Sequence, residues 1–503
     1  MTSRRDFLKK AGLISAAFAV PALNVNGNTT QSKIRLKNTK IAVDDRWDVI
    51  VIGAGMSGLG AGIRLALAGQ KVLLLEKHNS VGGLNGYYFR DGIKYDVGLH
   101  AMTNFVNKGS KKSPLMKLCR QLRLSYDDLQ LTEQIRSCIH FPDVQLFFSN
   151  HFELLSEEIA EKFPSQVDAF KRLVAAVLAV EDTSLTENSF ISTRALLRDF
   201  IPDPVLSEIL LTPLLYYGSA HVNDIDWRQF AILFKAIYLE GFARPRGGVR
   251  TLLNLLREHY RQLGGALRVK AAVEFVEANQ SGVNVHLLSG EILHASSVLS
   301  SIGYAETMRL CGQNQKLNGP RLSFMETITP LRGAPAEHHL KNTIVFYNDS
   351  MHMHYEAPED YADLRSGVIC VPENYEDGCL HDCTTLRTTH LANYLYWKRL
   401  SKNAYAEMKR VFLEQSRQRV FSLFGQAQEP VIIAEDIFTP LTVERYTGHM
   451  DGAIYGSPDK IRNGDIGIPN VFICGTDQGF LGIVGALLSG ISMANYHVIQ
   501  PNV

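Results

Sequence analysis

The sequence is poor in cysteine and has no excess of charge of either sign. Its 503 residues include 7 cysteines, 52 basic and 51 acidic side chains, and the formal net charge is +1. So few and scattered cysteines exclude a disulfide framework, and a balanced charge gives no reason to expect a nucleic-acid partner. The nearest pair of cysteines, Cys379 and Cys383, lacks the usual zinc spacing. We therefore expect a globular chain without nucleic acid or a structural metal.

Histidine pairs are the remaining candidates for a metal site. His338 and His339 are adjacent, and Met and His alternate from Met351 to His354. The alternation predicts a strand that places His352 and His354 on one face. No carboxylate pattern accompanies these histidines, so we expect no metal there.

A second nucleotide-binding motif is also missing. The pattern G-x-G-x-x-G occurs in full only once, at Gly53, Gly55 and Gly58. The β-branched run 48–52 precedes it and the small-residue stretch 59–67 follows it, which is the order of a strand, a glycine turn and a helix. The chain is therefore expected to bind one dinucleotide.

Each glycine of the motif has its own physical role. Gly53 permits the tight turn out of the strand, Gly55 lets a pyrophosphate approach the backbone, and Gly58 lets the helix pack on the sheet. The helix start offers free N–H groups and the positive end of its dipole to the diphosphate. A second apolar run, 71–75, ends in Glu76, whose carboxylate is placed to accept hydrogen bonds from the adenosine ribose.

Glycines recur in two further places. The pair Gly82-Gly83 follows the second expected strand, where a second backbone segment can approach the cofactor. Near the C-terminus, an expected strand at 471–474 leads through a glycine-rich turn into a helix at 482–496, which again offers N–H donors. Because no second complete motif exists, we expect one FAD that spans both ends rather than a separate NADPH domain.

The motifs predict an α/β fold in which a discontinuous, Rossmann-like FAD-binding domain carries an inserted α+β substrate domain. The apolar and aromatic side chains of the mostly helical stretch 113–240 form either plain core or a substrate tunnel or membrane-touching face. The expected segments are a signal peptide at 1–23, a linker at 24–45, FAD-binding parts at 46–112, 241–310 and 431–503, a helical cap at 113–240, and a second substrate part at 311–430.

Three local predictions concern single elements. The aromatic segment 87–95 reads as a hairpin that turns at 91–92. The block 269–276 reads as a strand that returns to the sheet of the first domain. A helix is expected over 391–424, with a break near Ser401.

The beginning of the sequence reads as an export signal. Residues 3–10 (SRRDFLKK) contain twin arginines, and the apolar stretch 11–23 is too short to span a bilayer comfortably. Residues 17–19 (AFA) suit cleavage. The alternative is a basic amphipathic helix that stays in the cytosol. With export, we expect a periplasmic protein in contact with the membrane surface, loaded with flavin before it meets the twin-arginine machinery.

These blocks together resemble the FAD-dependent family of phytoene desaturases, carotenoid isomerases and retinol saturases and, more distantly, flavin amine oxidases and protoporphyrinogen oxidase. The resemblance runs from about Trp47 to the C-terminus. Its most specific points are the glycine motif with Glu76, the Gly82-Gly83 pair, the segment Pro245-Arg246-Gly247-Gly248 and residues 470–490. The segments Asp96-Val-Gly98-Leu-His100, 439–446 and 452–456 are similar to the retinol saturase and carotenoid isomerase branch.

The resemblance implies a set of FAD contacts. It places Glu76 at the ribose and Val273 at the adenine, and the N–H groups of Val484 and Gly485 at the pyrimidine edge of the flavin. It places Asp477 along the diphosphate and ribityl chain. Many relatives carry an arginine after the glycine pair, where this chain has Leu84-Asn85. The full set of expected contacts is Gly53, Ala54, Gly55, Ser57, Gly58, Glu76, Lys77, Gly82, Gly83, Leu84, Val273, Gly475, Thr476, Asp477, Gly482, Val484 and Gly485.

The resemblance further implies an oxidoreductase that saturates, desaturates or isomerises a C=C bond of a long apolar substrate, such as a carotenoid, a retinoid or an unsaturated acyl chain. The flavin N5 would exchange a hydride with carbon. Because NAD(P)H is not expected in the periplasm, oxygen, a quinone or a redox protein would accept electrons. His100 is the one catalytic candidate, against the alternative of a histidine satisfied inside the FAD domain.

Two other functions stay open at this point. One is a flavin amine oxidase for a small amine, which an aromatic pair facing the flavin would support. The other is a flavin-loaded protein without catalysis that binds a lipid or a redox partner.

Overall fold

The structure, a computed structural model, describes residues 46–98, 101–110, 112–181, 189–313, 321–375, 383–425 and 430–500. These residues belong to one compact unit, Asp45–Val503. The expected signal peptide, the expected linker and His100 lie outside the described residues, so they stay predictions.

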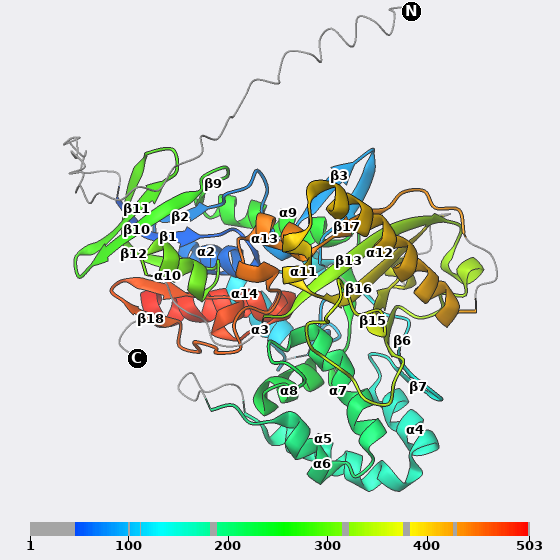
Figure 1. The fold of residues 1–503 in the computed structure, drawn as a ribbon. Helices are drawn as coiled ribbons and strands as arrows, with labels where there is room; N and C mark the ends of the chain where they lie inside the picture. Colours follow the sequence, from blue (N-terminus) through cyan, green and yellow to red (C-terminus); the bar gives the residue numbers. More distant parts are fainter. Residues whose placement is uncertain are drawn as a thin grey trace, which may run out of the picture. The chain divides into compact units, whose positions relative to one another are not determined.

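An eight-stranded sheet gathers three stretches of the chain that lie far apart in the sequence (Figure 1). Its main path runs β10-β11-β12-β1-β2-β9, and β19 pairs with β12 and with β18. Pairing is parallel among β1, β2, β9, β12 and β19. It is antiparallel wherever β10, β11 or β18 takes part. The strands are β1 (Arg46–Ile52), β2 (Val72–Leu75), β9 (Ala266–Arg268), β10 (Val273–Asn279), β11 (Gly282–Leu287), β12 (Ile292–Ser300), β18 (Asp465–Ile468) and β19 (Val471–Ile473).

Helices cover this sheet because its central strands are apolar on both faces. In β1 the residues from Val49 to Ile52 are all buried, as expected for a parallel strand inside an α/β layer. Val49 and Val51 pack towards the helical layer, and Ile50 and Ile52 pack towards the opposite face. The helices of the first face are α2 (Met56–Leu67), α3 (Pro114–Leu122), α9 (Val249–Gln262) and α14 (Gly482–Ala494), and the helix of the other face is α10 (Tyr304–Leu310).

Helices α2 and α14 approach each other unusually closely. A Cβ at Gly490 would lie 2.0 Å from the carbonyl oxygen of Ser57, and one at Gly60 would lie 2.7 Å from that of Leu487. Among the described residues, the helical stretch 482–499 is long and apolar enough to cross a membrane by length and composition, and half of it is buried inside the fold. Its packing on α2 accounts for that apolar composition.

A second, seven-stranded sheet has the order β17-β13-β16-β15-β14-β6-β7, and we call it the substrate sheet. All neighbours are antiparallel except β14 and β6, which are parallel. The strands are β6 (Ser137–Phe141), β7 (Val144–Phe148), β13 (Ser323–Arg332), β14 (Ile344–Asn348), β15 (Ser366–Cys370), β16 (Cys383–Ala392) and β17 (Asp436–Phe438).

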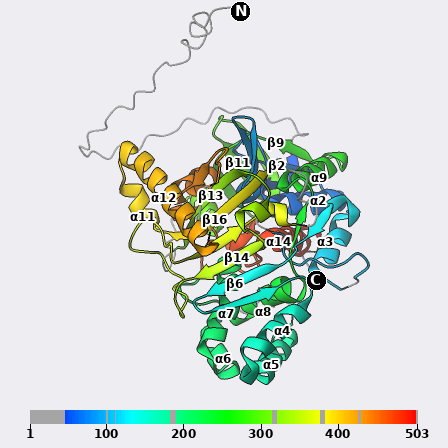
Figure 2. The ribbon, with the colours of Figure 1, turned by 90° about the vertical axis from the view of Figure 1, so that its right-hand side faces the viewer.

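Side chains of the substrate sheet alternate between two helical layers, because successive residues of a strand point to opposite faces. Phe346 and Val368 pack with the helices that follow β7, whereas Val345 and Ile369 pack with α12 (Figure 2). The helices of the first layer are α4 (Phe152–Lys162), α5 (Val167–Ala179), α6 (Thr193–Phe200), α7 (Pro204–Gly218) and α8 (Trp227–Phe234), and those near the other face are α11 (Tyr394–Arg399) and α12 (Lys402–Leu423).

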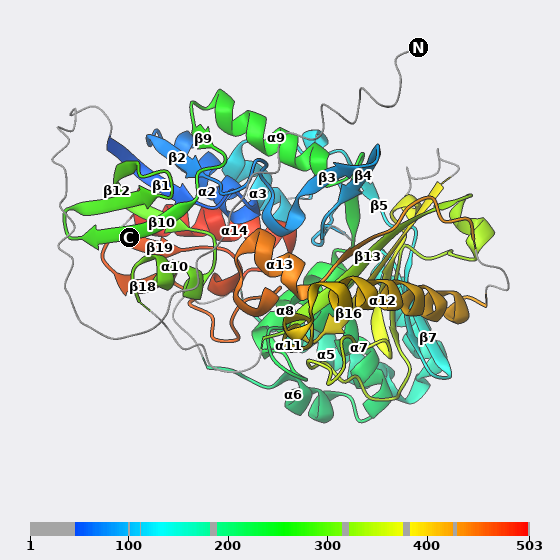
Figure 3. The same ribbon diagram turned by 45° about the horizontal axis from the view of Figure 1, so that its top comes forward.

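Small elements connect the two sheets. The strands β3 (Tyr87–Arg90) and β4 (Ile93–Asp96) form a hairpin of their own, and β5 (Leu131–Glu133) pairs with β8 (Ala243–Pro245). Helix α13 (Pro440–Thr447) lies between the two sheets (Figures 1 and 3). The expected hairpin turn is confirmed, since Asp91 and Gly92 both have positive φ, as a type I′ turn requires.

The predicted discontinuous α/β fold is confirmed, but several local expectations are wrong. The stretch 113–240 is mostly helical, as expected, and it also supplies the short strands β5, β6 and β7. Strand β17, expected within the last FAD-binding part, pairs with β13 of the substrate sheet. No strand forms at Met351–His354, where the imidazole of His352 instead lies 2.8 Å from the Glu208 carboxylate.

The helix expected over 391–424 begins later, because Leu391 and Ala392 pair with β13 as the end of β16. The break near Ser401 is confirmed, since its hydroxyl caps α12 at Ala404 N, 3.3 Å away. The strand expected at 269–276 begins only at Val273, as β10, and it joins the first sheet as predicted. Residues 269–272 cross from β9 at one edge of that sheet to β10 at the other.

Candidate cofactor and substrate cavity

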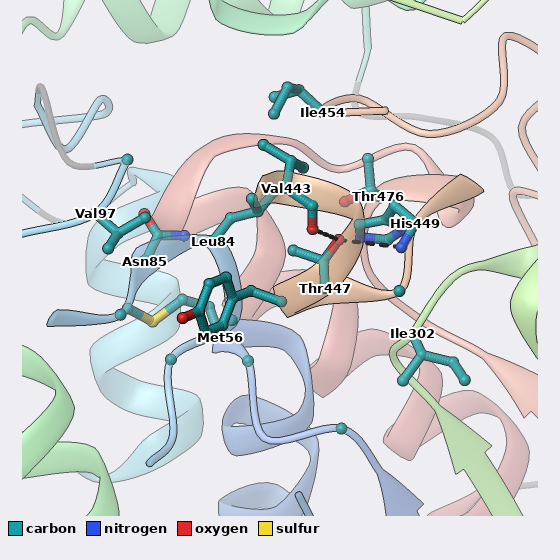
Figure 4. A pocket seen from close by; sticks show the side chains of 18 of the residues that line it. Met56, Leu84, Asn85, Val97, Ile302, Val443, Thr447, His449, Ile454 and Thr476 are labelled. Carbon is teal, nitrogen blue, oxygen red and sulfur yellow. Dashed lines mark hydrogen bonds between the residues drawn. The ribbon is translucent and has the colours of Figure 1, made fainter. Parts of the chain in front are cut away.

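A cavity of about 1140 Å³ is lined by residues of both halves of the fold. Its lining includes the glycine segments of the first sheet, helix α13 and one face of the substrate sheet. In Figure 4, hydrogen bonds join Thr447 to Val443 and His449 on one side of the pocket, and the side chain of Leu84 lies towards Val443. Sites for one drug-sized ligand occupy about 300–1,000 Å³, so this cavity has room for a dinucleotide and part of a second molecule.

The turn between β1 and α2 has the geometry that the glycine spacing predicts. Gly53 has a φ of +93°. A Cβ at Gly58 would lie 1.9 Å from the carbonyl oxygen of Gly53, so the helix can pack here only without a side chain. At Gly55, the nearest atoms to an added Cβ are backbone atoms of Gly82 and Gly83 at 4.0 Å. Gly55, Gly82 and Gly83 therefore form an open cradle that faces the cavity.

Two helix N-termini reach the cavity without side-chain caps. Helix α2 begins after Gly55 and α14 after Leu481, and neither has an acidic residue in its first turn. Gly55, Ser57, Leu481 and Gly482 all line the cavity. Uncapped N–H groups with the positive dipole end suit an anionic diphosphate at one helix and a polar ring edge at the other. The residues present thus fit an FAD molecule.

Glu76 is buried at the dinucleotide end of the cavity. Its carboxylate accepts hydrogen bonds from Ala54 N at 2.9 Å and His78 N at 3.0 Å, so it holds the glycine turn and the end of β2 together. Val273 lines the same cavity, because Ala271 N bonds to the Glu76 carbonyl at 2.8 Å as the chain crosses from β9 to β10. Burial lowers the pKa of Lys77, although the Glu76 charge opposes that shift.

The expected contacts divide into two groups. The residues that line the cavity are Gly53, Gly55, Ser57, Glu76, Lys77, Gly82, Gly83, Leu84, Val273, Thr476 and Gly482. The residues that lie behind this surface are Ala54, Gly58, Gly475, Asp477, Val484 and Gly485. Asp477 differs most from its expected place beside the diphosphate and ribityl chain, because its two oxygens accept Ser457 N and Tyr304 N, each at 2.7 Å. Ile483 and Ala486 line the cavity at the start of α14 instead.

Two of the motif segments meet at one carboxylate. Asp96 is buried and accepts hydrogen bonds from Arg244 at 2.8 Å and Arg250 at 2.7 Å. A Cβ at Gly248 would lie 2.0 Å from the same carboxylate, so glycine is required where the chain enters α9. The Asp96 segment and the 245–248 segment therefore act as one structural joint beside the cavity.

The substrate sheet supplies a mostly apolar floor. One row of the ladder runs through Phe438, Glu326, Thr389 and Val368 on the neighbouring strands β17, β13, β16 and β15, and all four line the cavity. Phe324 lies two residues before Glu326 and so shares its face. The aromatic side chains that complete this half are Tyr216, Tyr217, Tyr455 and Phe480.

Glu326 forms a buried ion pair. Its Oε1 accepts the Arg387 guanidinium, with Nε at 3.0 Å, and the Arg387 side chain is 2% exposed. On the same face of the sheet, Asp436 of β17 accepts the Tyr88 hydroxyl on Oδ2 and Arg90 on Oδ1, the latter at 2.9 Å. The sequence analysis missed these residues. The acid Glu326 within the apolar run of β13 was the available signal, since an unpaired charge is costly in a sheet interior.

Within the described part of the chain, no three His, Cys, Asp or Glu side chains gather in a way that could hold a metal ion. His338 bonds to the carbonyl of Arg332 at 2.9 Å. His100 lies outside the described residues, although Ala101 beyond it lines the cavity.

Comparison with known proteins agrees with this geometry. The family model described as flavin containing amine oxidoreductase matches residues 56–316. The chain is 22% identical to a chloroplastic prolycopene isomerase of Daucus carota, over 89% of this chain and 79% of that protein. It is 24% identical to the all-trans-retinol 13,14-reductase of Homo sapiens, over 92% of this chain and 87% of that protein.

Solved structures show the same fold at lower identity. Cyclohexylamine oxidase from Brevibacterium oxydans is 16% identical and has a TM-score of 0.59, with 91% of this chain and 100% of that chain covered. An oxidoreductase from Methanosarcina mazei is 13% identical and has a TM-score of 0.60, with 88% and 99% covered. The chain therefore belongs to the family of flavin-containing amine oxidoreductases and is an FAD-dependent oxidoreductase.

Proposed function

We propose that this protein saturates, desaturates or isomerises a C=C bond of a long apolar molecule such as a carotenoid, a retinoid or an unsaturated acyl chain. The observation that carries the proposal is the continuous cavity, which joins the glycine cradle at Gly55 to the aromatic half at Phe324. A small amine would leave most of the second half empty. Two similar proteins are named for prolycopene and all-trans-retinol, which supports a substrate of this shape.

Bound FAD supplies a carbon-directed hydride donor or acceptor at N5. Binding, orientation, exclusion of water and proton transfer are assigned to residues of this chain. The glycine cradle and the two helix starts bind the diphosphate and orient the ring. Phe324, Tyr216 and Tyr455 form an apolar wall that excludes water and holds a chain extended. His100 is proposed to move the proton; the residue after it, Ala101, lines the cavity.

The test follows the oxidation state of the flavin. The purified protein, both oxidised and after reduction without oxygen, is mixed with polyenes, unsaturated fatty acids, amines or quinone analogues, and its absorbance is recorded. Mass spectrometry identifies co-purified lipid. We expect a polyene to be converted, either with flavin reoxidation or, for an isomerisation, without net electron transfer. Rapid reduction of oxidised flavin by amines, with no effect of polyenes, would contradict the proposal. A flavin that reacts with none of them would favour a binding protein.

We further propose that the protein is exported by the twin-arginine machinery and works in the periplasm at the membrane surface, with oxygen, a quinone or a redox protein as electron acceptor. The twin arginines at 4 and 5 before an apolar stretch support this. Replacement of both arginines by lysine should leave the protein with its FAD in the cytosolic fraction. Unchanged fractionation would contradict the proposal.

A further inference from the structure

Thr103 is a buried residue with a hydroxyl group beside the start of helix α14. It is 5% exposed, and it lines the cavity together with Gly482, the first residue of that helix. A Cβ added to Gly482 would lie 3.6 Å from Thr103 Oγ1. The hydroxyl oxygen of Thr103 therefore borders the part of the cavity that adjoins the N-terminus of α14.

A chain of two hydrogen bonds fixes the direction in which this hydroxyl points its hydrogen. Thr103 Oγ1 donates to Asn104 Oδ1 at 3.1 Å, and Asn104 Nδ2 donates to Glu240 Oε2 at 2.7 Å. A carboxylate can only accept hydrogen bonds, so the amide nitrogen of Asn104 must face Glu240 and the amide oxygen must face Thr103. Because the hydrogen of Thr103 is used in this way, its oxygen offers a ligand only lone pairs.

The backbone holds Thr103 in place from both sides. Met102 N donates to the carbonyl of Ala243 at 2.8 Å, and Asn104 N donates to the carbonyl of Ala236 at 3.0 Å. Ala236 lies in a π-helical turn, a feature that is frequent at functional sites. Asn104 has a φ of +65°, in the left-handed region that asparagine tolerates better than most residues. The oxygen of Thr103 is therefore pre-organised before a ligand binds.

The pyrimidine edge of a flavin needs both donors and an acceptor. It carries the carbonyl groups C2=O and C4=O, and between them the N3–H group, which is the one donor of that edge. The first N–H groups of α14 have no side-chain cap and suit a carbonyl oxygen. They cannot bind N3–H, which needs an acceptor. Thr103 supplies a lone pair directly beside these helix donors.

We propose that Thr103 Oγ1 accepts a hydrogen bond from flavin N3–H, and that Asn104 and Glu240 are positioning residues that hold the hydroxyl in this orientation. The charge of Glu240 polarises both hydrogen bonds of the chain, which makes the oxygen of Thr103 a better acceptor. The inference concerns the recognition of FAD and holds for any substrate of the enzyme, so it goes beyond the proposed function and does not depend on it.

The test compares FAD with 3-methyl-FAD, in which a methyl group replaces the hydrogen on N3. Both are titrated into the deflavinated full chain, and binding is read from flavin fluorescence, which requires no turnover. The wild type should bind FAD at least about tenfold more tightly, because the methyl group removes a buried hydrogen bond and overlaps the hydroxyl. Thr103→Ala should weaken FAD about 5- to 100-fold, the usual effect of a buried donor left without an acceptor. The same variant should bind 3-methyl-FAD more tightly than the wild type does, because it makes room for the methyl group.

Three further variants separate recognition from folding. Thr103→Ser keeps the hydroxyl and should keep the wild-type preference for FAD. Glu240→Gln changes a residue that lines no part of the cavity, but its amide can face Asn104 with either atom, so the hydroxyl is no longer held in one direction and the preference should fall at least about threefold. Thr212→Val is the matched control. It removes a buried hydroxyl that bonds to the Glu208 carbonyl at 2.8 Å, away from the cavity, and it should leave the preference unchanged.

Four outcomes would overturn the proposal. If the wild type binds both flavins equally, or if Thr103→Ala keeps the wild-type preference, another group accepts the hydrogen bond from N3–H. If Thr103→Ala weakens both flavins to the same extent, the residue supports the fold and does not recognise the ring. If Glu240→Gln leaves the preference unchanged, the carboxylate does not position the hydroxyl. None of these outcomes changes the expectation for C=C chemistry, which is tested separately.

Discussion

The glycines of the nucleotide motif differ in the atoms that an added Cβ methyl group would contact. At Gly58 it would overlap the carbonyl oxygen of Gly53, which belongs to the backbone and cannot rotate away. At Gly55 the φ is −72°, which any residue adopts, and the methyl group would meet only open space at the cradle. Two glycines three residues apart therefore serve folding and binding separately.

This separation predicts opposite outcomes for two alanine substitutions. Gly58→Ala should destabilise the fold by about 1–3 kcal/mol, the usual loss for an overpacked core. Gly55→Ala should change stability by less than ~1 kcal/mol but lower FAD affinity at least about tenfold, because the methyl group occupies the space of the diphosphate. Thermal unfolding of the apoprotein and FAD titration measure the two effects. Equal stability of both variants would refute the assignment.

His390 shows the energetic effect of a buried titratable group away from the cavity. Its ring bonds to the Ser366 carbonyl and to the Ser416 hydroxyl, each at 3.0 Å, and it has no exposed surface. Burial lowers its pKa to about 4 from its usual value of 6.5, although hydrogen bonds to backbone carbonyls oppose that shift. The histidine is therefore neutral in the folded protein at neutral pH.

The lowered pKa of His390 predicts a specific loss of stability in acid. Above pH ~6.5 the folded and unfolded states are both neutral at this residue. As the pH falls towards ~4, only the unfolded state binds the proton, so stability falls by ~1.4 kcal/mol per pH unit, about 3 kcal/mol in total.

His390→Gln removes this proton uptake. Urea unfolding at pH 7 and pH 5 should show the difference between the two pH values reduced by about 2 kcal/mol relative to the wild type. If the variant lost as much stability as the wild type over that range, the buried neutral histidine would be the wrong explanation. Measurements at pH 8 serve as the control, because neither form titrates at this residue there.

At the scale of elements, capping decides where the helices of the substrate layer begin. The Asp203 carboxylate accepts Val205 N at 2.9 Å and Leu206 N at 3.0 Å at the start of α7. Helix α7 then runs apolar on nearly all sides and carries Tyr216 and Tyr217 to the cavity. Since α7 shows little amphipathic pattern of its own, its first residue is set by this cap and Pro204.

Removal of the Asp203 N-cap should lower the free energy of unfolding by an amount typical of helix caps. Asp203→Ala is expected to lower the free energy of unfolding by about 1 kcal/mol, because two helix N–H groups lose their acceptor. Glu161→Ala, at an exposed position within α4, should change it by less than ~0.5 kcal/mol. Chemical denaturation compares the two variants. A smaller loss for Asp203→Ala than for Glu161→Ala would contradict the assignment of the cap.

At the scale of the whole molecule, residues of both sheets line one cavity and can contact the same ligand. The glycine cradle belongs to the eight-stranded sheet and the floor to the substrate sheet, with α13 between them (Figure 3). A dinucleotide that fills the first half contacts segments that are more than 400 residues apart, Gly55 and Gly482. FAD should therefore stabilise the folded chain as one unit.

Deflavinated protein tests this expectation. FAD at 100 times its dissociation constant should raise the free energy of unfolding by ~2.7 kcal/mol, because it binds the folded state and not the unfolded chain. Differential scanning calorimetry should show a single transition that moves to higher temperature as FAD is added. Unfolding in two steps, with only the first step shifted by FAD, would show that the two sheets are not coupled through the ligand.

The sequence alone determined the dinucleotide half of the protein. The motif at Gly53 to Gly58, the acid at 76 and the second glycine turn before α14 are local features. In these segments the geometry of strand, turn and helix follows from neighbouring residues. The family model of flavin containing amine oxidoreductases, which matches residues 56–316, agrees with a dinucleotide-binding half. Which of these residues line the cavity was less predictable, since Asp477 and Val484 are not among its lining residues.

Only the tertiary structure decided the substrate half. Strand β6 pairs with β14 and β17 pairs with β13, in each case across more than 100 residues of chain, and the register that puts Glu326 opposite Thr389 and Phe438 is a property of such pairing. A pattern along one strand predicts which residues share a face, but it cannot say which strand lies beside it. The glycine cradle could therefore be predicted from local spacing, whereas the part of the cavity that the substrate sheet lines arises only from long-range contacts.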